Sequence, residues 1–324
     1  MPHSHRAPSA RSVYTPAPMT KVRFGLVIPA EFPDQSGAHS LLEDASRAIC
    51  RAEGHFESVW VVDHFQAGTV NRLEAFTLLT YLAARHPAFK FGHTVLCQSF
   101  RNPALVAKMG ATLQLLSGGR FILGMGAGGD EEEYEAYGYP FPTAPERVEQ
   151  LEEAITIIKA LWSAPAVTFN GKHHRVNRAV CEPRPNPTPP LMVGAFRPRM
   201  LRLVAKHADC WNVSSSGPIR YARMAAEMER ACLESGRGPA TLTRSWVGGV
   251  ACATTSLAAE QLGGSRFTQD DEDYSLVGTP AEVTSQMQTL IDLGVDYFML
   301  DIAGFPQLDA LELLITDVLP AVTG

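Results

Sequence analysis

The stretch FILGMGAGGDEEEYEAYGYP, residues 121–140, joins a short apolar run to a glycine-rich turn and then to a run of acidic residues. Gly124, Gly126 and Gly129 have the spacing G-x-G-x-x-G, which is typical of a dinucleotide-binding loop. Four acidic side chains (130–133) follow at once, where a pyrophosphate requires the positive end of a helix. The stretch also follows the fourth apolar run of the chain, whereas a doubly wound fold places this loop after its first strand. The spacing therefore does not indicate a dinucleotide site.

Eight short apolar runs alternate with longer amphipathic segments, and this alternation indicates the fold class. The expected strands are 22–28, 58–62, 90–96, 121–125, 190–194, 209–213, 244–252 and 296–300. The expected helices are 40–53, 73–85, 103–116, 145–162, 198–207, 218–235, 280–293 and 307–319. Near-continuous apolar strands that alternate with helices indicate a parallel sheet with its outer face covered. Eight such units in 324 residues predict a single (β/α)8 TIM barrel.

The domain boundaries follow from the same pattern. Residues 1–20 are rich in Pro and Ser and are expected to form a flexible N-terminal tail, and residues 21–324 are expected to form the barrel domain. Two segments interrupt the alternation of strands and helices. Residues 167–190 predict a small hairpin that turns at Asn170-Gly171. Residues 253–277 are polar and predict a mobile loop with one short helix after the seventh strand.

Composition excludes several classes of protein. The net charge is −6 and there is no basic block, which argues against a nucleic-acid or anionic-membrane surface. No apolar run reaches the roughly 18 residues of a membrane span. The six cysteines are scattered, without metal-ligand spacing, so they are expected to be reduced thiols of a cytoplasmic protein that holds no metal.

In a TIM barrel the chemistry lies at the carboxyl ends of the strands, and there the sequence places Asp63 and His64 directly after the run 58–62. His64 can act as an acid, a base or a hydrogen-bond donor. A capping Asp beside a surface His is an equally weighted alternative. The chain has no nucleophile-elbow pattern and no paired carboxylates typical of a metal hydrolase. The barrel is therefore expected to hold a ligand rather than to attack one.

Several motifs together resemble a known family. They are SVWVVDHF (58–65), GHTVLCQSFRNPALVAKMGATLQLLSGGRFILGMGAGGDEEEYEAYGYPFP (92–142) and LVAKHADCWN (203–212). These residues resemble the bacterial luciferase-like oxidoreductase superfamily, and the resemblance covers residues 21–320. The chain is most similar to the branch that depends on the deazaflavin coenzyme F420. The FMN-dependent monooxygenases share the same (β/α)8 fold.

The resemblance implies where a cofactor would lie. In the family a flavin or deazaflavin ring lies across the carboxyl-terminal mouth of the barrel. His64 matches the histidine near this ring and is the expected catalytic residue, with Asp63 beside it in the cofactor site. Thr94-Val95 matches the position of a non-proline cis peptide that forms a bulge behind the ring.

The glycine-rich turn receives its interpretation from the same resemblance. The backbone at Gly126, Ala127 and Gly128 is expected to approach the cofactor closely, which a Cβ atom would prevent. Gly129 is expected to provide the turn. Asp130 together with Glu133 would then cap a short helix whose acidic start is solvated.

The cofactor phosphate is expected after the fifth strand, at Gly194, Ala195, Phe196 and Arg197, because backbone N–H groups and an arginine gather there before a helix. Relatives more often have a run of glycines at this place, so Ala195 and Phe196 depart from the family. Gly129 is a second departure, since it stands where sugar-phosphate dehydrogenases of the family have a catalytic glutamate. A sugar-phosphate substrate is therefore not expected.

The resemblance favours hydride transfer between F420 and an apolar or aromatic organic substrate. The aromatic residues expected to shape the pocket are Phe32, Phe65, Phe100, Trp211 and Trp246. One alternative is a monooxygenase that uses oxygen and reduced FMN supplied by a partner reductase. Another is a barrel without a cofactor that serves as a binding or subunit protein. Relatives commonly dimerise through helices beside the second and third strands, which implies a homodimer.

Overall fold

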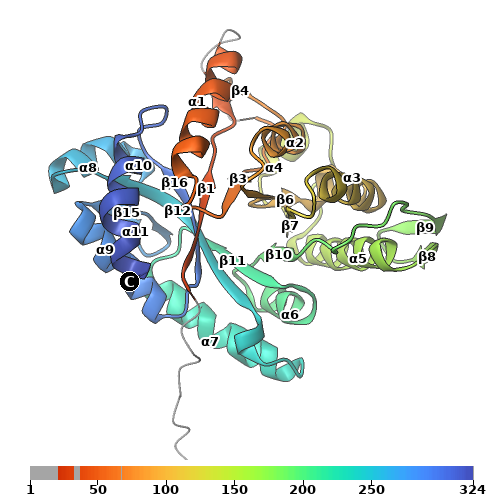
Figure 1. Ribbon diagram of the computed structural model, residues 1–324. Helices are drawn as coiled ribbons and strands as arrows, with labels where there is room; N and C mark the ends of the chain where they lie inside the picture. Colours follow the sequence, from red (N-terminus) through yellow and green to blue (C-terminus); the bar gives the residue numbers. More distant parts are fainter. Residues whose placement is uncertain (1–20, 33–36, 67, 324) are drawn as a thin grey trace, which may run out of the picture.

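The computed structural model describes residues 21–32, 37–66 and 68–323, so the flexible tail expected at 1–20 lies outside the described residues. Within these residues, eight parallel strands form a closed barrel in the order β10-β11-β12-β16-β1-β3-β5-β7, and pairing of β7 with β10 closes it. The helices lie around the outside of the strands (Figure 1). The predicted (β/α)8 barrel is confirmed.

All eight barrel strands match the expected runs to within a few residues. They are β1 (Arg23–Val27), β3 (Ser58–Val61), β5 (Lys90–His93), β7 (Phe121–Gly126), β10 (Leu191–Gly194), β11 (Cys210–Ser214), β12 (Thr243–Cys252) and β16 (Tyr297–Ile302). Three short strands lie at the carboxyl end of the barrel. They are β2 (Glu31–Phe32), β4 (Asn71–Arg72), which pairs with β2, and β6 (Leu96–Cys97).

The outer helices also match, with one exception. They are α1 (Gly37–Ala52), α2 (Ala75–Arg85), α3 (Pro103–Leu116), α5 (Ala144–Ser163), α6 (Pro198–His207), α7 (Pro218–Glu234) and α9 (Pro280–Asp292). The single helix expected at 307–319 is instead α10 (Asp309–Leu313), a π-helical turn (Leu314–Val318) and α11 (Leu319–Thr323). A short helix, α4 (Glu131–Ala136), follows the glycine-rich turn.

The expected hairpin is present as β8 (Val167–Asn170) and β9 (Arg175–Ala179), beside α5 in Figure 1. Its connection is longer than the predicted Asn170-Gly171 turn, since the N–H of Gly171 donates to the carbonyl of His174. The carboxylate of Glu153 on α5 explains this length. It accepts the backbone N–H groups of Lys172 (2.7 Å), His173 (3.0 Å) and His174 (2.8 Å), so the four-residue loop folds around it.

The segment after β12 has more regular structure than the expected loop with one helix. It contains α8 (Ser256–Gly263), a hairpin of β13 (Gln269–Asp270) and β14 (Asp273–Tyr274), and β15 (Leu276–Gly278), which pairs in parallel with β12. The side chain of Gln286 on α9 bonds to both backbone groups of Val277, which fixes β15 against that helix.

Side chains alternate between the barrel interior and the outer layer. Trp60 lies in the interior with Met192, Tyr297 and Met299, and all four are nearly or fully buried. The indole N–H of Trp60 donates to the hydroxyl of Ser58 (2.6 Å), which is bonded in turn to the Tyr297 hydroxyl (2.6 Å). The outward-facing residues form the larger core between strands and helices. No helix within the described ranges is long and apolar enough to cross a membrane.

His93 is fully buried on the outer side of β5, where its ring packs against Phe76 of α2 at a centroid distance of 5.0 Å. Burial lowers the pKa of His93 to about 4, although Asp63 opposes this. Between the unperturbed pKa of about 6.5 and pH 4, the unfolded chain binds a proton that the folded chain excludes. We therefore expect His93 to reduce the free energy of unfolding by up to about 3 kcal/mol as the pH falls through this window.

Urea unfolding of wild type and a His93→Phe variant at several pH values tests this expectation. Above pH 6.5 the histidine is neutral in both states, so its contribution is constant there. The variant keeps a ring at this place and has no group that titrates, so its stability should change less between pH 6.5 and pH 4. Equal slopes for the two proteins would contradict the assignment to His93.

Candidate active site at the barrel mouth

The Thr94-Val95 peptide directly follows β5 at the carboxyl-terminal mouth, and it is cis as the resemblance implied. The Thr94 hydroxyl accepts a hydrogen bond from the amide of Asn212 (3.1 Å), so the bulge is held by β11, a strand that is not a neighbour of β5. The Val95 side chain is partly exposed and lies over two glycines. A Cβ added at Gly126 would come within 2.6 Å of a Val95 methyl, and one at Gly194 within 3.3 Å. These glycines therefore leave room for Val95, which gives the mouth an apolar floor.

The glycine-rich turn depends on Gly128 rather than on Gly129. Gly128 has a φ of +78°, and a Cβ there would lie 2.1 Å from the hydroxyl of Tyr134 and 2.7 Å from the sulfur of Cys97. Gly129 has no such φ, and a Cβ on it would meet open space. The expectation that Gly129 provides the turn is therefore wrong, because the left-handed residue is the one before it.

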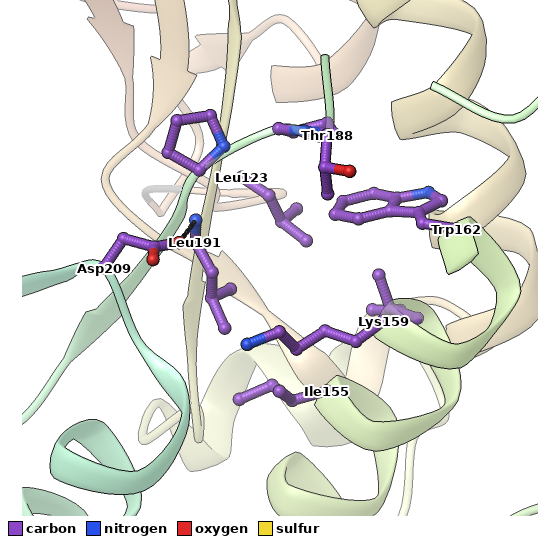
Figure 2. Close-up of a pocket in the computed structure, with 10 residues that line it drawn as sticks. Leu123, Ile155, Lys159, Trp162, Thr188, Leu191 and Asp209 are labelled. Carbon is purple, nitrogen blue, oxygen red and sulfur yellow. Dashed lines mark hydrogen bonds between the residues drawn. The ribbon is translucent and has the colours of Figure 1, made fainter. Parts of the chain in front are cut away.

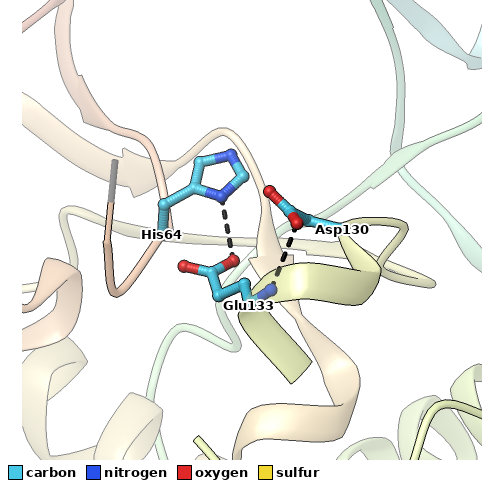
Figure 3. A group of neighbouring side chains, drawn as sticks. All are labelled: His64, Asp130 and Glu133. Carbon is cyan, nitrogen blue, oxygen red and sulfur yellow. Dashed lines mark hydrogen bonds and ion pairs between the residues drawn. The ribbon is translucent and has the colours of Figure 1, made fainter. Parts of the chain in front are cut away.

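His64 and Glu133 form a hydrogen-bonded pair at the rim of the mouth (Figure 3). Nδ1 of His64 lies 3.0 Å from one carboxylate oxygen of Glu133. The other oxygen accepts the backbone N–H groups of Phe65 and Gln66. Because this carboxylate acts as an acceptor, Nδ1 carries the proton and Nε2 of a neutral ring is left with a lone pair. The His64 side chain is 41% exposed, whereas that of Glu133 is 2% exposed.

The prediction that the acidic run is exposed to solvent is wrong for Glu133, whose side chain is buried. Asp130 does cap α4, since its side chain accepts the N–H of Glu133 (3.2 Å). Glu133, however, does not reach back to the cap, because its carboxylate bonds to the residues after β3. The ligand atoms of His64, Asp130 and Glu133 lie within 4.8 Å of one another. Since the hydrogen bonds above account for this proximity, we assign no metal to the cluster.

Asp63 lies on the outer side of the barrel wall and not in the cofactor site where it was expected. Its carboxylate accepts two hydrogen bonds from Arg101 (both 2.8 Å) and one from the N–H of Cys97 (2.9 Å), and its side chain is fully buried. Arg101 also pairs with Glu74 at the start of α2. Successive residues of a strand point to opposite faces, so Val62 faces the interior and Asp63 faces outward. The network joins the ends of β3 and β6 below His64.

An aromatic cluster lies beside His64. Phe65 stacks on Phe100 with ring centroids 4.5 Å apart, and Tyr137 lies 4.7 Å from Phe65. Tyr134 and Tyr139 pack against Phe100 from α4 and the segment that follows it. Phe65 is partly exposed, so it can contribute to a pocket wall, whereas Phe100 is buried beneath it. The sequence prediction named the two phenylalanines and missed the tyrosines.

Two of the expected pocket residues do not lie at the mouth. Trp211 and Trp246 are fully buried in the outer layer, where Trp211 stacks on Tyr221 of α7 and Trp246 packs against Phe298. They point outward because their neighbours Asn212 and Ser245 point inward and bond to each other (2.8 Å). Phe32 is partly exposed on β2.

The loop after β10 offers fewer backbone donors than expected. The N–H of Ala195 donates to the carbonyl of Asn212, and its carbonyl accepts the indole N–H of Trp211. The ring of Phe196 lies 5.2 Å from the guanidinium carbon of Arg220. Arg197 is exposed and precedes α6 without a side-chain cap, and Pro198 is the first helical residue. In this loop, Arg197 and the first N–H groups of α6 are therefore the groups that remain available to an anion.

A separate pocket of about 430 Å³ lies between α5 and the amino ends of β10 and β11 (Figure 2). Leu123, Ile155, Trp162 and Leu191 give it apolar walls, with Lys159 at its edge. Its charged groups are engaged elsewhere, since Lys159 donates to the carbonyl of His207 (2.8 Å) and Asp209 accepts the N–H of Leu191 (2.8 Å). Because it lies at the amino ends of the strands, it is not continuous with the mouth.

Comparison with known proteins shows which family this chain resembles in sequence and fold. The family model described as luciferase-like monooxygenase matches residues 22–268. An F420-dependent glucose-6-phosphate dehydrogenase of Intrasporangium calvum is 29% identical over 90% of this chain and 97% of its own length. An F420-dependent hydroxymycolic acid dehydrogenase of Mycobacterium tuberculosis is 30% identical over 72% of this chain and 64% of its own. The solved structure of an F420-dependent secondary alcohol dehydrogenase superposes with a TM-score of 0.80 at 20% identity, over 94% of this chain and 100% of its own.

Proposed function

Because the chain belongs to the luciferase-like monooxygenase family, we propose that it is an oxidoreductase that transfers a hydride between coenzyme F420 and an apolar or aromatic organic substrate. The observation that carries this proposal is the His64–Glu133 pair at the edge of a mouth with an apolar floor. The names of two relatives, both F420-dependent dehydrogenases, support the choice of cofactor.

The residues at the mouth fit this cofactor. Val95 offers a flat ring an apolar surface to rest on, and Gly126 and Gly194 beside it add no side chain that would block the approach. Arg197 and the N-terminus of α6 are the groups we assign to the cofactor phosphate. When bound there, F420 supplies a ring carbon that can accept or release a hydride.

His64 is the residue we assign to proton transfer. With Nδ1 bonded to Glu133, Nε2 can accept the proton of a substrate hydroxyl or return it to a carbonyl oxygen. Glu133 fixes the orientation of the ring and stabilises the imidazolium while it carries the second proton. Phe65 and the aromatic cluster beneath it exclude water from one side of His64.

Two further features belong to the same proposal. We propose that the protein works as a homodimer, supported by Leu105, Leu115 and Leu116, which α3 exposes by 52%, 63% and 70%. We also propose a cytoplasmic location, which agrees with six cysteines that are all free thiols.

Titration of the purified protein with F420, and separately with FMN, tests the cofactor. We expect cofactor binding to quench fluorescence at micromolar concentrations of F420 and much higher concentrations of FMN. Arg197→Ala should weaken F420 binding by about tenfold, because one charge-assisted contact to a phosphate is lost. Preference for FMN would instead favour the monooxygenase alternative with a partner reductase, and binding of neither would remove the cofactor assignment.

A further inference from the structure

The cationic side chains around the mouth are all arginines. The loops that follow the eight barrel strands, together with the first turns of the helices after them, contain no lysine. They contain seven arginines: Arg72, Arg101, Arg147, Arg197, Arg199, Arg220 and Arg266. The masked parts of these loops, 33–36 and 67, have no Lys or Arg in the sequence.

Five of the seven arginines form ion pairs with carboxylates. The ion pairs are Arg72–Glu31, Arg101–Asp63 and Glu74, Arg199–Glu149, Arg220–Glu272 and Arg266–Asp301. Arg147 donates to the carbonyls of Gly128 (3.2 Å) and Pro142 (2.6 Å). Among the described residues, Arg197 alone of the seven has neither a carboxylate nor a carbonyl partner. It stands where the cofactor phosphate is expected.

Arg266 is the cation that the segment after β12 brings to the mouth. Asp301 pairs in register with Gly249 of β12, and a Cβ on Gly249 would lie 2.4 Å from the ring of Phe267. Phe267 therefore packs directly over the barrel wall, and the Arg266 guanidinium lies 5.1 Å above its ring and bonds to Asp301. Burial raises the pKa of Asp301, Arg266 opposes this, and the charge of Glu31 adds to it. An anion placed here would have to compete with Asp301 for Arg266.

We propose that the substrate of this site is an uncharged alcohol or the corresponding ketone, and that phosphorylated and carboxylated compounds are excluded by the pairing of the mouth arginines. This proposal rests on the proposed function and limits its substrates to uncharged alcohols and ketones. A phosphate that enters a partly buried site needs charged donors to replace its water. Of the two arginines that have no carboxylate partner in the described part of the chain, Arg147 is held by two backbone carbonyls, and Arg197 is reserved for the cofactor. A hydroxyl or carbonyl needs one partner, which Nε2 of His64 supplies.

The first test compares substrates on the enzyme loaded with F420, after F420 binding has been measured by titration. We expect turnover of an uncharged secondary alcohol such as cyclohexanol, and a kcat/KM at least about 100-fold lower for a hexose phosphate. A hexose phosphate used as well as the alcohol overturns the proposal. Absence of F420 binding is a different result, because it removes the proposed cofactor without any substrate having been compared.

The second test needs neither cofactor nor turnover. In protein that carries Arg197→Ala, so that the expected cofactor-phosphate site is lost, we measure binding of methyl phosphate by the broadening of its ³¹P signal. Addition of Asp301→Asn frees Arg266 and should tighten methyl phosphate binding by about tenfold. Further addition of Arg266→Met should cancel the gain. If the Arg197→Ala protein binds methyl phosphate equally tightly with and without Asp301→Asn, the proposal is overturned.

Discussion

A His64→Ala variant is expected to lose about 10²- to 10⁴-fold in kcat, the range that a positioned acid or base contributes. The loss should appear in kcat because the ring acts on the reacting hydroxyl, whereas the apolar floor and Arg197 remain to bind F420. Steady-state rates with the best uncharged alcohol, together with an F420 titration of each protein, measure the two effects separately. A variant that keeps its kcat but loses F420 affinity would reassign His64 to cofactor binding.

Glu133→Gln is the matched control for this prediction. The amide oxygen can still accept the N–H groups of Phe65 and Gln66, so the loop after β3 keeps its bonds. The amide nitrogen then faces Nδ1 of His64 and can only donate to it, which moves the ring proton to Nε2. We expect a smaller loss of kcat than in His64→Ala, together with a reversed tautomer in the ¹⁵N spectrum of the ring. An unchanged spectrum would show that Glu133 does not fix His64.

The sequence allowed the barrel and the position of His64 at its carboxyl end to be predicted, because both depend on local pattern. A short apolar run that alternates with longer amphipathic segments indicates a buried strand. A titratable residue directly after such a strand lies at the carboxyl end of the barrel. Glu133 could not be found in this way. Its partner lies 69 residues earlier, and D-E-E-E before a helix has the composition of a solvated start. The capping spacing of Asp130 and Glu133 was visible, but the direction of the Glu133 side chain is decided by the loop after β3.

The direction of strand side chains explains the other errors. Asp63, Trp211 and Trp246 each lie at the expected end or within the expected strand, and each points to the outer layer. Period-two alternation divides a strand into two faces, but the pattern of a strand buried on both sides does not show which face is inside. Polar residues within an apolar strand are the signal that could have shown which face points into the barrel. Asn212 and Ser245, which bond inside the barrel, are next to the two tryptophans.

Trp60→Ala is expected to lower the free energy of unfolding by about 3–5 kcal/mol, since it leaves a cavity in the middle of the barrel. The indole is fully buried and fills the interior between Tyr297 and Gly92, its direct neighbour on β5. Gly92 has no side chain for this reason, because a Cβ there would lie 2.3 Å from the indole ring. Gly92→Ala alone should therefore also destabilise the fold, by about 1–3 kcal/mol, through overpacking.

The two substitutions should compensate each other when combined. A methyl group at position 92 that collides with the indole occupies part of the cavity once the indole is gone, so the double variant should be more stable than the sum of the single effects predicts. Guanidinium unfolding of the four proteins gives the coupling energy, and Trp60→Phe shows how much of the loss a smaller ring restores. Additive effects would mean that Trp60 and Gly92 do not share this space, and that the barrel interior is filled in another way.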